Sequence, residues 1–496
     1  MFKNIKHSFW APLYEGGLFV VGGADLEFMG YLKGWSGHTL LIYLLFRVML
    51  FLDFRYYIGC LCLTAFLAAC SNSECLECVA EQMVAANSQS EMATKQVLRP
   101  SYAITSCSAY EDLKEDCLPV EETLLFNDSL YPYVGLPRIV IRTENNKGVE
   151  TRKNFVNAKF QIFGQSNPES KVYDMMIRGR GNTTWLFYPK KPYAIKFNEK
   201  VSLFGLPKAK KWVLLANYRE RTLMRNALAL KVASDTDLKW NPKGVFVELF
   251  LNEKFLGNYY LCEKIEVKKN RLNIDKESYL LEFDTNYDEE YKFKTKIKKY
   301  PVNIKNPENP TDASFEYIRN YIDTVESIIY KGKWDLDIED YIDFNSFADY
   351  FIVYNVSQNY EINHPKSVFM YKEPNKKLKV GPVWDFDYMT FKPTKLGLCC
   401  VGSLWYDKLR KNQNFISILK KKWNSYKKEF LKNDVFIDSI ADYIRESNER
   451  NLSLWPIDIE GDSIGDEELD FDDAIEMLKN AYKDQISELD LEINGL

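Results

Sequence analysis

Two aspartates stand two residues apart in residues 381–387, which read GPVWDFD. Asp385 and Asp387 follow a short apolar run and are interleaved with Trp384 and Phe386. Carboxylate oxygens in this setting can hold a divalent cation beside a phosphate group. We therefore predict that Asp385 is a metal ligand, and that Asp387 is either a second ligand or the partner of a basic group.

A third carboxylate, Glu361, precedes this pair in residues 359–367, which read NYEINHPKS. Phosphoryl transfer also needs a carboxylate that accepts the proton of the attacking hydroxyl. In the same segment, Asn363 could supply a neutral ligand to a metal or a phosphate, and Lys366 could neutralise phosphate charge. We expect His364 to be a hydrogen-bond partner within the loop rather than a base.

Candidate phosphate contacts lie far upstream. Arg178 begins the sequence RGRGNTTW, whose glycines permit a tight turn that brings backbone amides near an anion, although an ordinary hairpin turn explains them equally well. Lys196 shares a predicted strand face with the small Ala194, which would leave room for a ligand; a solvated lysine is the alternative. Glu248 or Glu263 could orient Lys196, or either could pair with a neighbouring lysine across strands.

The elements that must position these side chains follow from hydrophobic periodicity. Short runs bounded by turn residues predict strands at residues 138–142, 158–163, 172–177, 193–197, 368–372 and 378–380, and a hairpin over 245–265 that turns near 252–254. Apolar residues at helical spacing predict helices over residues 222–230, 315–329, 344–354 and 416–430. Thr222 and Asp343 are candidate N-caps. We expect this α+β chain to bring Lys196, Asp385 and Asp387 into one pocket.

The order of these motifs resembles the CotH kinase family, atypical kinases of bacteria and some fungi. The resemblance spans roughly residues 134–430 and rests on residues 177–185, 190–197, 211–226, 247–265, 279–284, 301–307 and 344–387. It implies an atypical protein-kinase-like fold with an N-terminal β-rich part and a helical C-terminal part. One departure is that Glu361 stands where the family has an aspartate two residues after an asparagine.

The resemblance also implies an activity. ATP with Mg²⁺ or Mn²⁺ would donate phosphate to Ser or Thr hydroxyls of exported proteins. The implied roles are catalysis for Glu361 and Asp385, nucleotide contact for Lys196, Arg178 and Glu263, and metal binding for Asp385, Asp387 and Asn363.

Two other functions remain open on the sequence alone. A catalytically silent surface lipoprotein could keep the same scaffold to bind a protein or a glycan, and the scarcity of ATP outside the inner membrane favours it. A glycosidase could use Asp385 and Glu361 as its carboxylate pair.

Composition excludes several classes of function. The 496 residues include 15% aromatic side chains, enough for a sizeable core, and carry a net charge of −5. Basic residues are interleaved with acidic ones, so we expect no binding to nucleic acid. The chain has three histidines, His7, His38 and His364, and the first two lie in the predicted leader, which argues against a Ser-His-Asp hydrolase or a multi-histidine metal site.

The N-terminal region has the pattern of an export signal. Arg55 precedes an apolar stretch that ends in Leu67-Ala-Ala-Cys70, which looks like a bacterial lipobox and predicts cleavage before Cys70 and its lipidation. A membrane helix is the alternative, but charged residues interrupt the apolar runs before they reach about 20 residues. The expected location is the cell envelope, lipid-anchored, with the outer membrane of a Gram-negative bacterium favoured.

These patterns predict four parts. Residues 1–69 are a leader, with Met49 as a possible true start; residues 70–133 are a tether and a small cysteine-containing segment. Residues 134–430 form the kinase-like domain, and residues 431–496 form a helical C-terminal extension.

Overall fold

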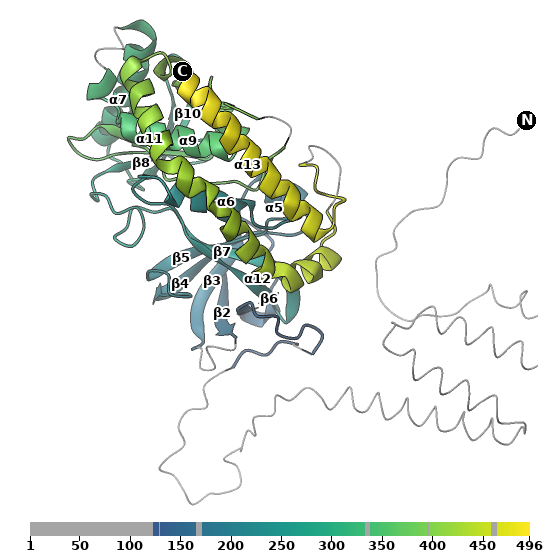
Figure 1. Cartoon of the computed structure of the whole chain (residues 1–496). Coiled ribbons are helices and arrows are strands. Elements are labelled where there is room, and N and C mark those ends of the chain that lie inside the picture. The colour runs from purple at the N-terminus through teal and green to yellow at the C-terminus, as the bar shows by residue number, and fades with distance from the viewer. Residues whose placement is uncertain (1–122, 128, 165–170, 333–337, 394–395, 458–463) are drawn as a thin grey trace, which may run out of the picture. The chain divides into compact units, whose positions relative to one another are not determined.

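The computed structural model describes residues 123–496 except 128, 165–170, 333–337, 394–395 and 458–463. The predicted leader, Cys70 and most of the tether lie outside the described residues. Within the described part of the chain, no helix has both the length and the apolar character needed to cross a membrane. The described residues belong to one compact unit, with β-strands first and most helices later (Figure 1).

A seven-stranded closed barrel forms the N-terminal part, in the order β1-β2-β3-β4-β5-β7-β6. Its strands are β1 (Arg138–Thr143), β2 (Val156–Phe163), β3 (Tyr173–Gly179), β4 (Tyr193–Val201), β5 (Ala209–Leu215), β6 (Gly244–Leu251) and β7 (Lys254–Glu263). Six of the pairings are antiparallel, and the parallel pairing of β1 with β6 closes the barrel, with Ile139 opposite Leu249. The β-rich N-terminal part was predicted, whereas its closure was not.

Alternation along each strand fills the barrel. Tyr193, Ile195 and Phe197 of β4 belong to the buried cluster inside the barrel, so Ala194 and Lys196 face outward, as the period of two predicts. Phe160 of β2 meets Phe197 edge-to-face, with ring centroids 5.0 Å apart. The barrel is therefore a packed core, and a ligand must bind at its rim or outside it.

A second sheet and the helices form the rest of the molecule. The sheet has the order β12-β11-β8-β10-β9 and contains β8 (Tyr279–Phe283), β9 (Lys292–Lys294), β10 (Pro301–Asn306), β11 (Val368–Lys372) and β12 (Leu378–Val380). The helices are α5 (Thr183–Phe187), α6 (Arg225–Ser234), α7 (Asp312–Lys331), α9 (Phe344–Val356), α10 (Tyr406–Leu409), α11 (Gln413–Leu431), α12 (Asn433–Leu454) and α13 (Phe471–Gly495), with 3₁₀ turns η3 (Glu144–Asn146), η4 (Ile338–Asp340) and η5 (Tyr360–Asn363). The sheet and the helices α6, α7 and α9 to α13 share one large hydrophobic core, whereas Trp185 of α5 packs against the barrel cluster.

Local sequence signals predicted one turn and one helix N-cap correctly and a second N-cap wrongly. The hairpin of β6 and β7 turns at Asn252 and Glu253, which both have positive φ, and the Asp343 carboxylate accepts hydrogen bonds from the first turn of α9. Thr222 is not the N-cap of α6, which begins at Arg225. The Thr222 hydroxyl instead donates to the buried Glu220 carboxylate at 2.6 Å, which removes it from the helix end.

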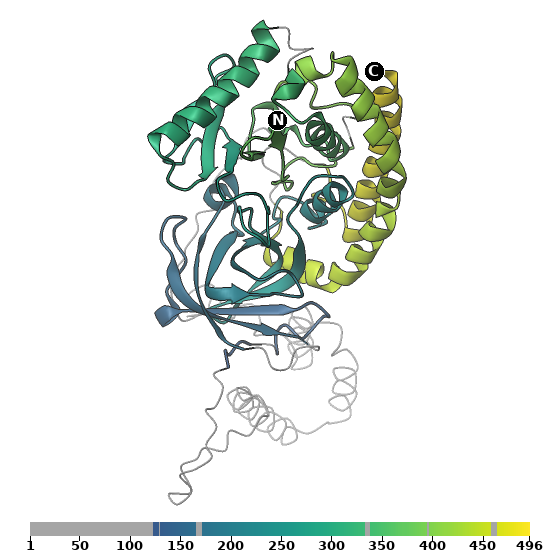
Figure 2. The ribbon, with the colours of Figure 1, turned by 90° about the vertical axis from the view of Figure 1, so that its left-hand side faces the viewer.

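The C-terminal helices are part of the main core. Ile437 and Ile444 of α12 and Leu478 and Leu489 of α13 are buried in the same cluster as α9. Helix α12 continues from there along β7 of the barrel, and Figure 2 shows these yellow-green and yellow helices flanking the molecule from its helical part to the barrel. Helices α12 and α13 therefore belong to the core of the domain.

Candidate functional site

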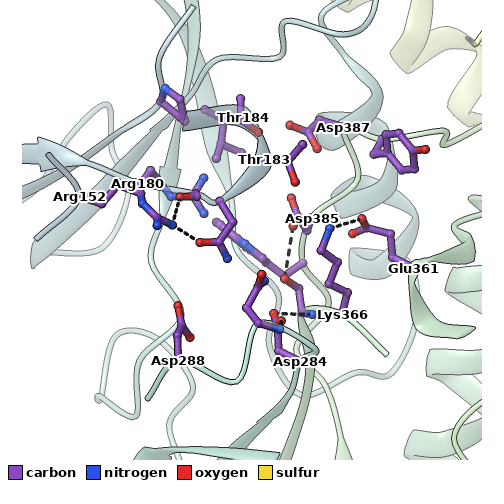
Figure 3. A pocket seen from close by; sticks show the side chains of 18 of the residues that line it. Arg152, Arg180, Thr183, Thr184, Asp284, Asp288, Glu361, Lys366, Asp385 and Asp387 are labelled. Carbon is purple, nitrogen blue, oxygen red and sulfur yellow. Dashed lines mark hydrogen bonds and ion pairs between the residues drawn. The ribbon is translucent and has the colours of Figure 1, made fainter. Parts of the chain in front are cut away.

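A cavity of about 960 Å³ opens where the ends of β3 and β7 approach the loops that follow β8 and β12 (Figure 3). We call it the charged cavity. Its charged lining residues are Arg152, Lys153, Arg178, Arg180, Arg219, Lys264, Glu282, Asp284, Asp288, Glu289, Lys305, Glu361, Lys366, Asp385 and Asp387. The arginines all come from the barrel and its loops, and the carboxylates all come from the part of the chain that follows it.

The loop after β12 presents Asp385 to the cavity. Asp385 has φ of 70°, a left-handed conformation that costs a residue with a Cβ atom some strain. Two polar contacts hold it: Asn359 Nδ2 donates to the Asp385 carbonyl at 3.0 Å, and the Ser367 hydroxyl donates to Asp385 Oδ2 at 3.3 Å. The side chain therefore points into the cavity beside the segment that carries Glu361 (Figure 3).

Glu361 lies in the 3₁₀ turn η5. The side chain of Asn359 caps this turn by accepting the Glu361 amide at 2.9 Å, and Lys366 Nζ lies 3.2 Å from Glu361 Oε1. Burial, together with the negative charge of Asp385, raises the pKa of Glu361 to about 8. Burial alone would lower the pKa of Lys366, but the Glu361 carboxylate raises it above its usual value.

The pKa values of two more carboxylates in the cavity, Asp387 and Asp284, are also raised. Burial and the neighbouring Asp385 raise the pKa of Asp387 to about 7, although Arg180 opposes the shift. Burial also raises the pKa of Asp284, whose oxygens accept the backbone amides of Asn286 at 2.7 Å and Ser367 at 3.2 Å. Acids that share a cavity and repel one another bind protons or a cation more readily than isolated ones do.

The barrel supplies the opposite charge. Burial and the adjacent Arg180 lower the pKa of Arg178, and Arg180 lies over the Trp384 ring at 5.4 Å. Burial and nearby cations, Lys211 first among them, lower the pKa of Lys264 to about 8. Cations held together in this way against their own repulsion favour an anionic ligand.

The turn after β3 owes its shape to two glycines. A Cβ atom on Gly179 would lie 2.4 Å from the Trp185 ring, so only glycine permits this contact. Gly181 has φ of 75°, and its carbonyl accepts a 2.8 Å hydrogen bond from Arg152. The predicted tight turn is present, and it sets Arg178 and Arg180 at the cavity wall.

Comparison with known families adds a further observation. The model of the family described as CotH kinase protein matches residues 177–484, which is the bulk of the chain. The chain belongs to the CotH kinase family. A search of curated proteins finds no match. The family match includes α11, α12 and most of α13, in agreement with their place in the core.

The structure brings some of the residues predicted for this CotH kinase family member together and separates others. Arg178, Glu361, Asp385 and Asp387 line the charged cavity. Asn363 is not among its lining residues, and its side-chain oxygen instead accepts the Ser403 hydroxyl. Each predicted role stays a prediction, but four of the side chains share one cavity.

The expected pocket joining Lys196 to the two aspartates is not what the structure shows. Lys196 is not among the residues that line the cavity, because it lies opposite Met176 on β3, two positions farther from the rim than Arg178. Glu263 does not orient Lys196 either: its Oε1 accepts from Arg271 Nη1 at 2.7 Å. Glu248 forms ion pairs with Arg138 and Arg450.

Several charged residues of this CotH family cavity were missed, among them Arg180, Lys264, Glu282, Asp284 and Lys305. Glu282 lies in β8 and Asp284 directly follows that strand, Lys264 directly follows β7, and Lys305 lies in β10. Lys305 Nζ lies 3.2 Å from Glu282 Oε2, and burial raises the pKa of Glu282 to about 7. The sequence YLLEFD does hold a signal, because Glu282 and Asp284 alternate with apolar residues just as Asp385 and Asp387 do.

The fit of this cavity to a metal ion can be tested on its donors. Among the described residues, no three His, Cys, Asp or Glu side chains converge as a preformed metal site. Mg²⁺ is commonly held by one or two carboxylates, with phosphate oxygens and water completing its coordination. Asp385 and Asp387 fit that mode of binding, whereas a metal held by protein ligands alone does not fit.

Proposed function

We propose that the protein is an atypical protein kinase that transfers phosphate from ATP to Ser or Thr hydroxyls of exported proteins. The observation that carries this proposal is the separation of charge across one cavity, with arginines from the barrel facing carboxylates from the second part of the chain. A triphosphate with a divalent cation is complementary to such a surface. Membership of the CotH kinase family supports the same conclusion. On this proposal the barrel serves as the N-terminal lobe of a kinase-like fold.

Asp385 is the residue best placed to hold Mg²⁺ or Mn²⁺, with Asp387 beside it. The cation would neutralise charge on the transferred phosphoryl group. The left-handed backbone of Asp385 and its contacts with Asn359 and Ser367 fix where the carboxylate points. The positive charge of Arg180 partly offsets the rise in the pKa of Asp387, so the basic side of the cavity favours the charged form of this carboxylate.

Arg178, Arg180 and Lys264 are the proposed phosphate contacts, in place of Lys196. Arg178 Nε has no hydrogen-bond partner among the described residues, although its Nη1 donates to the Arg152 carbonyl. An unused donor on a half-buried guanidinium lowers stability unless a ligand accepts from it. Phosphate oxygens would accept from this donor and would lie within the positive field of all three side chains.

Glu361 is the proposed acceptor of the hydroxyl proton. Its carboxylate is held by Lys366, which also lines the cavity, and the turn that carries it is fixed by Asn359. Because Asp385 contributes to the raised pKa of Glu361, neutralising Asp385 makes Glu361 a readier carboxylate at neutral pH. Lys366 can then stabilise whichever oxygen in the site bears the negative charge.

Calorimetric titration of the full chain in mild detergent with ATP and Mn²⁺ tests the proposal. The wild type should give metal-dependent heat, and Asp385→Asn should abolish it while leaving the fold unchanged, because asparagine tolerates positive φ. Asp442→Asn, at a side chain that is 81% exposed, is the matched control. Absence of heat from the wild type at every metal concentration would overturn the kinase proposal.

One observation favours a second function, a silent scaffold that binds a protein or a glycan. Glu361 is one methylene longer than the aspartate expected by resemblance, and a misplacement of about 1 Å can cost on the order of a hundredfold in rate. A silent scaffold predicts that neither ATP nor its metal complex shifts the melting temperature of the wild type.

We also propose that the protein is exported and anchored in the cell envelope through a lipid on Cys70, on the evidence of the Leu67-Ala-Ala-Cys70 pattern. Metabolic labelling with a radioactive fatty acid should mark the wild type and leave Cys70→Ala unlabelled.

A further inference from the structure

The loop that carries Asp385 and Asp387 is held from behind by buried side chains of α6. We define the acidic loop as residues 384–391. Three of its residues with a Cβ atom, Asp385, Met389 and Phe391, have φ between 53° and 70°. Such strain persists only where the surroundings over-determine the backbone, so the loop needs strong external contacts.

Asn226 makes one of these contacts. Its Oδ1 accepts the Phe386 amide at 2.9 Å, and its Nδ2 donates to Asn217 Oδ1 at 3.0 Å. Asn217 in turn donates to the Leu223 carbonyl at 2.7 Å. The orientation of the Asn226 side chain is therefore fixed, and its oxygen holds the backbone of Phe386, the residue between the two aspartates, in place.

Arg225 makes the second contact, at the other end of the loop. Its Nη1 donates to the carbonyls of Thr390 at 2.6 Å and Phe391 at 3.0 Å. The side chain is fully buried and is not among the residues that line the charged cavity, so Arg225 acts on the loop and not on a ligand.

Asp466 and Glu220 hold Arg225 in turn. Arg225 Nη2 donates to Asp466 Oδ2 at 2.8 Å, and Arg225 Nε lies 3.4 Å from Glu220 Oε2. Asp466 comes from the segment between α12 and α13, so the last part of the family match reaches the back of the site.

We infer that Arg225 and Asn226 are positioning residues that set the direction of the Asp385 and Asp387 side chains, and that Asp466 completes this support. The inference rests on the proposed function for its effect on nucleotide, but its structural claim stands on the apo protein. Removing either α6 side chain leaves buried backbone groups of the loop without a partner, and the loop should then relax toward less strained conformations.

Hydrogen exchange of the full chain in mild detergent, without ligand, tests the structural claim. Asn226→Ala and Arg225→Lys should each speed exchange in peptides covering the acidic loop about tenfold, since one unmade buried hydrogen bond costs about that factor or more. Asn433→Ala is the matched control: Asn433 is equally buried, but it bonds Asp235 and Tyr482 away from the loop. Loop exchange that stays at the wild-type rate in both α6 variants, or that rises equally in the control, would overturn the inference.

Binding of ATP with Mn²⁺ then measures the functional consequence. Affinity should fall about tenfold in both α6 variants and stay unchanged in Asn433→Ala, at temperatures where all three remain folded. A loop that exchanges faster but binds as tightly as the wild type would contradict the positioning role. If the wild type itself binds no nucleotide, the kinase proposal fails, and loop exchange alone decides the inference.

Asp466→Asn provides a further test in case Asn226→Ala and Arg225→Lys do not fold. It keeps the shape of the side chain and removes the charge that faces Arg225, so faster exchange confined to the acidic loop is the expected result. Exchange at the wild-type rate in this variant, with Asn226→Ala and Arg225→Lys unfolded, would overturn the proposal.

Discussion

Lys190 Nζ donates a 2.7 Å hydrogen bond to Asn451 Oδ1, which joins the residue just before the β4 region to α12 across 261 positions of sequence. Lys190 is fully buried, and it also donates to the carbonyls of Ala216 and Asn258. Burial lowers the pKa of Lys190 well below its usual value. The barrel and α12 thus share a buried polar contact.

Asn451→Ala should destabilise the protein by about 2 kcal/mol, because the buried Lys190 and the Asn258 amide both lose an acceptor. Denaturant unfolding measures this change. In a Lys190→Met background the same substitution should cost less, because the buried amine is already absent. Strict additivity of the two substitutions would show that the contact contributes no coupling.

Lys264→Met should weaken binding of ATP with Mn²⁺ about tenfold, because a charge-assisted contact to phosphate is lost. Lys196→Met is the matched control, since Lys196 lies on the same outer face of the barrel but not among the cavity-lining residues. Calorimetric titration of both variants with ATP and Mn²⁺ shows which of the two lysines contributes to nucleotide binding. A loss in Lys196→Met with none in Lys264→Met would restore the assignment made from the sequence.

Glu361→Gln should lower phosphate transfer about a hundredfold or more while nucleotide affinity changes by less than about threefold, because the amide cannot accept the hydroxyl proton. Transfer of labelled phosphate to a Ser- and Thr-rich acceptor protein provides the measurement. Glu429→Gln, at an exposed helix position, is the control. Equal transfer by Glu361→Gln and the wild type would remove Glu361 from the mechanism.

Glu220 should make stability depend on pH. Burial raises its pKa to about 8 although Arg225 opposes the shift, and the negative charge of Asp466 in the same buried cluster adds to it. The folded state therefore holds a proton that the unfolded state releases, and the free energy of unfolding should fall as pH rises from about 4.5 to 8, by up to about 1.4 kcal/mol per pH unit. Glu220→Gln should flatten this dependence in denaturant melts taken across that range. An identical slope in both proteins would contradict the assignment.

Local sequence signals located the acidic side of the site because its parts are close in the chain. Glu361, Asp385 and Asp387 flank the β11–β12 hairpin, whose strands and turn were predicted, so the hairpin itself brings them together. Strand alternation also predicted the outward face of Lys196 correctly.

Register and closure could not be predicted in the same way. Alternation gives the face of a strand but not the end at which a cavity opens, and the antiparallel register that sets Ala194 opposite Arg178 leaves Lys196 two residues from the rim. The pairing of β1 with β6 joins segments more than a hundred residues apart, and no local pattern encodes it. The contacts of Arg225 depend on two distant segments, which carry Thr390 and Asp466, so helical periodicity left its orientation open.

Barrel closure limits how another protein can dock. Each of the seven strands has two hydrogen-bonded neighbours, so an extended peptide finds no open edge there to extend by main-chain pairing. The five-stranded sheet ends in β12 and β9, which are three residues long each and offer little length for such pairing. On the proposed function, an acceptor protein would therefore be recognised through its side chains, and selectivity among acceptors would reside in the loops around the charged cavity.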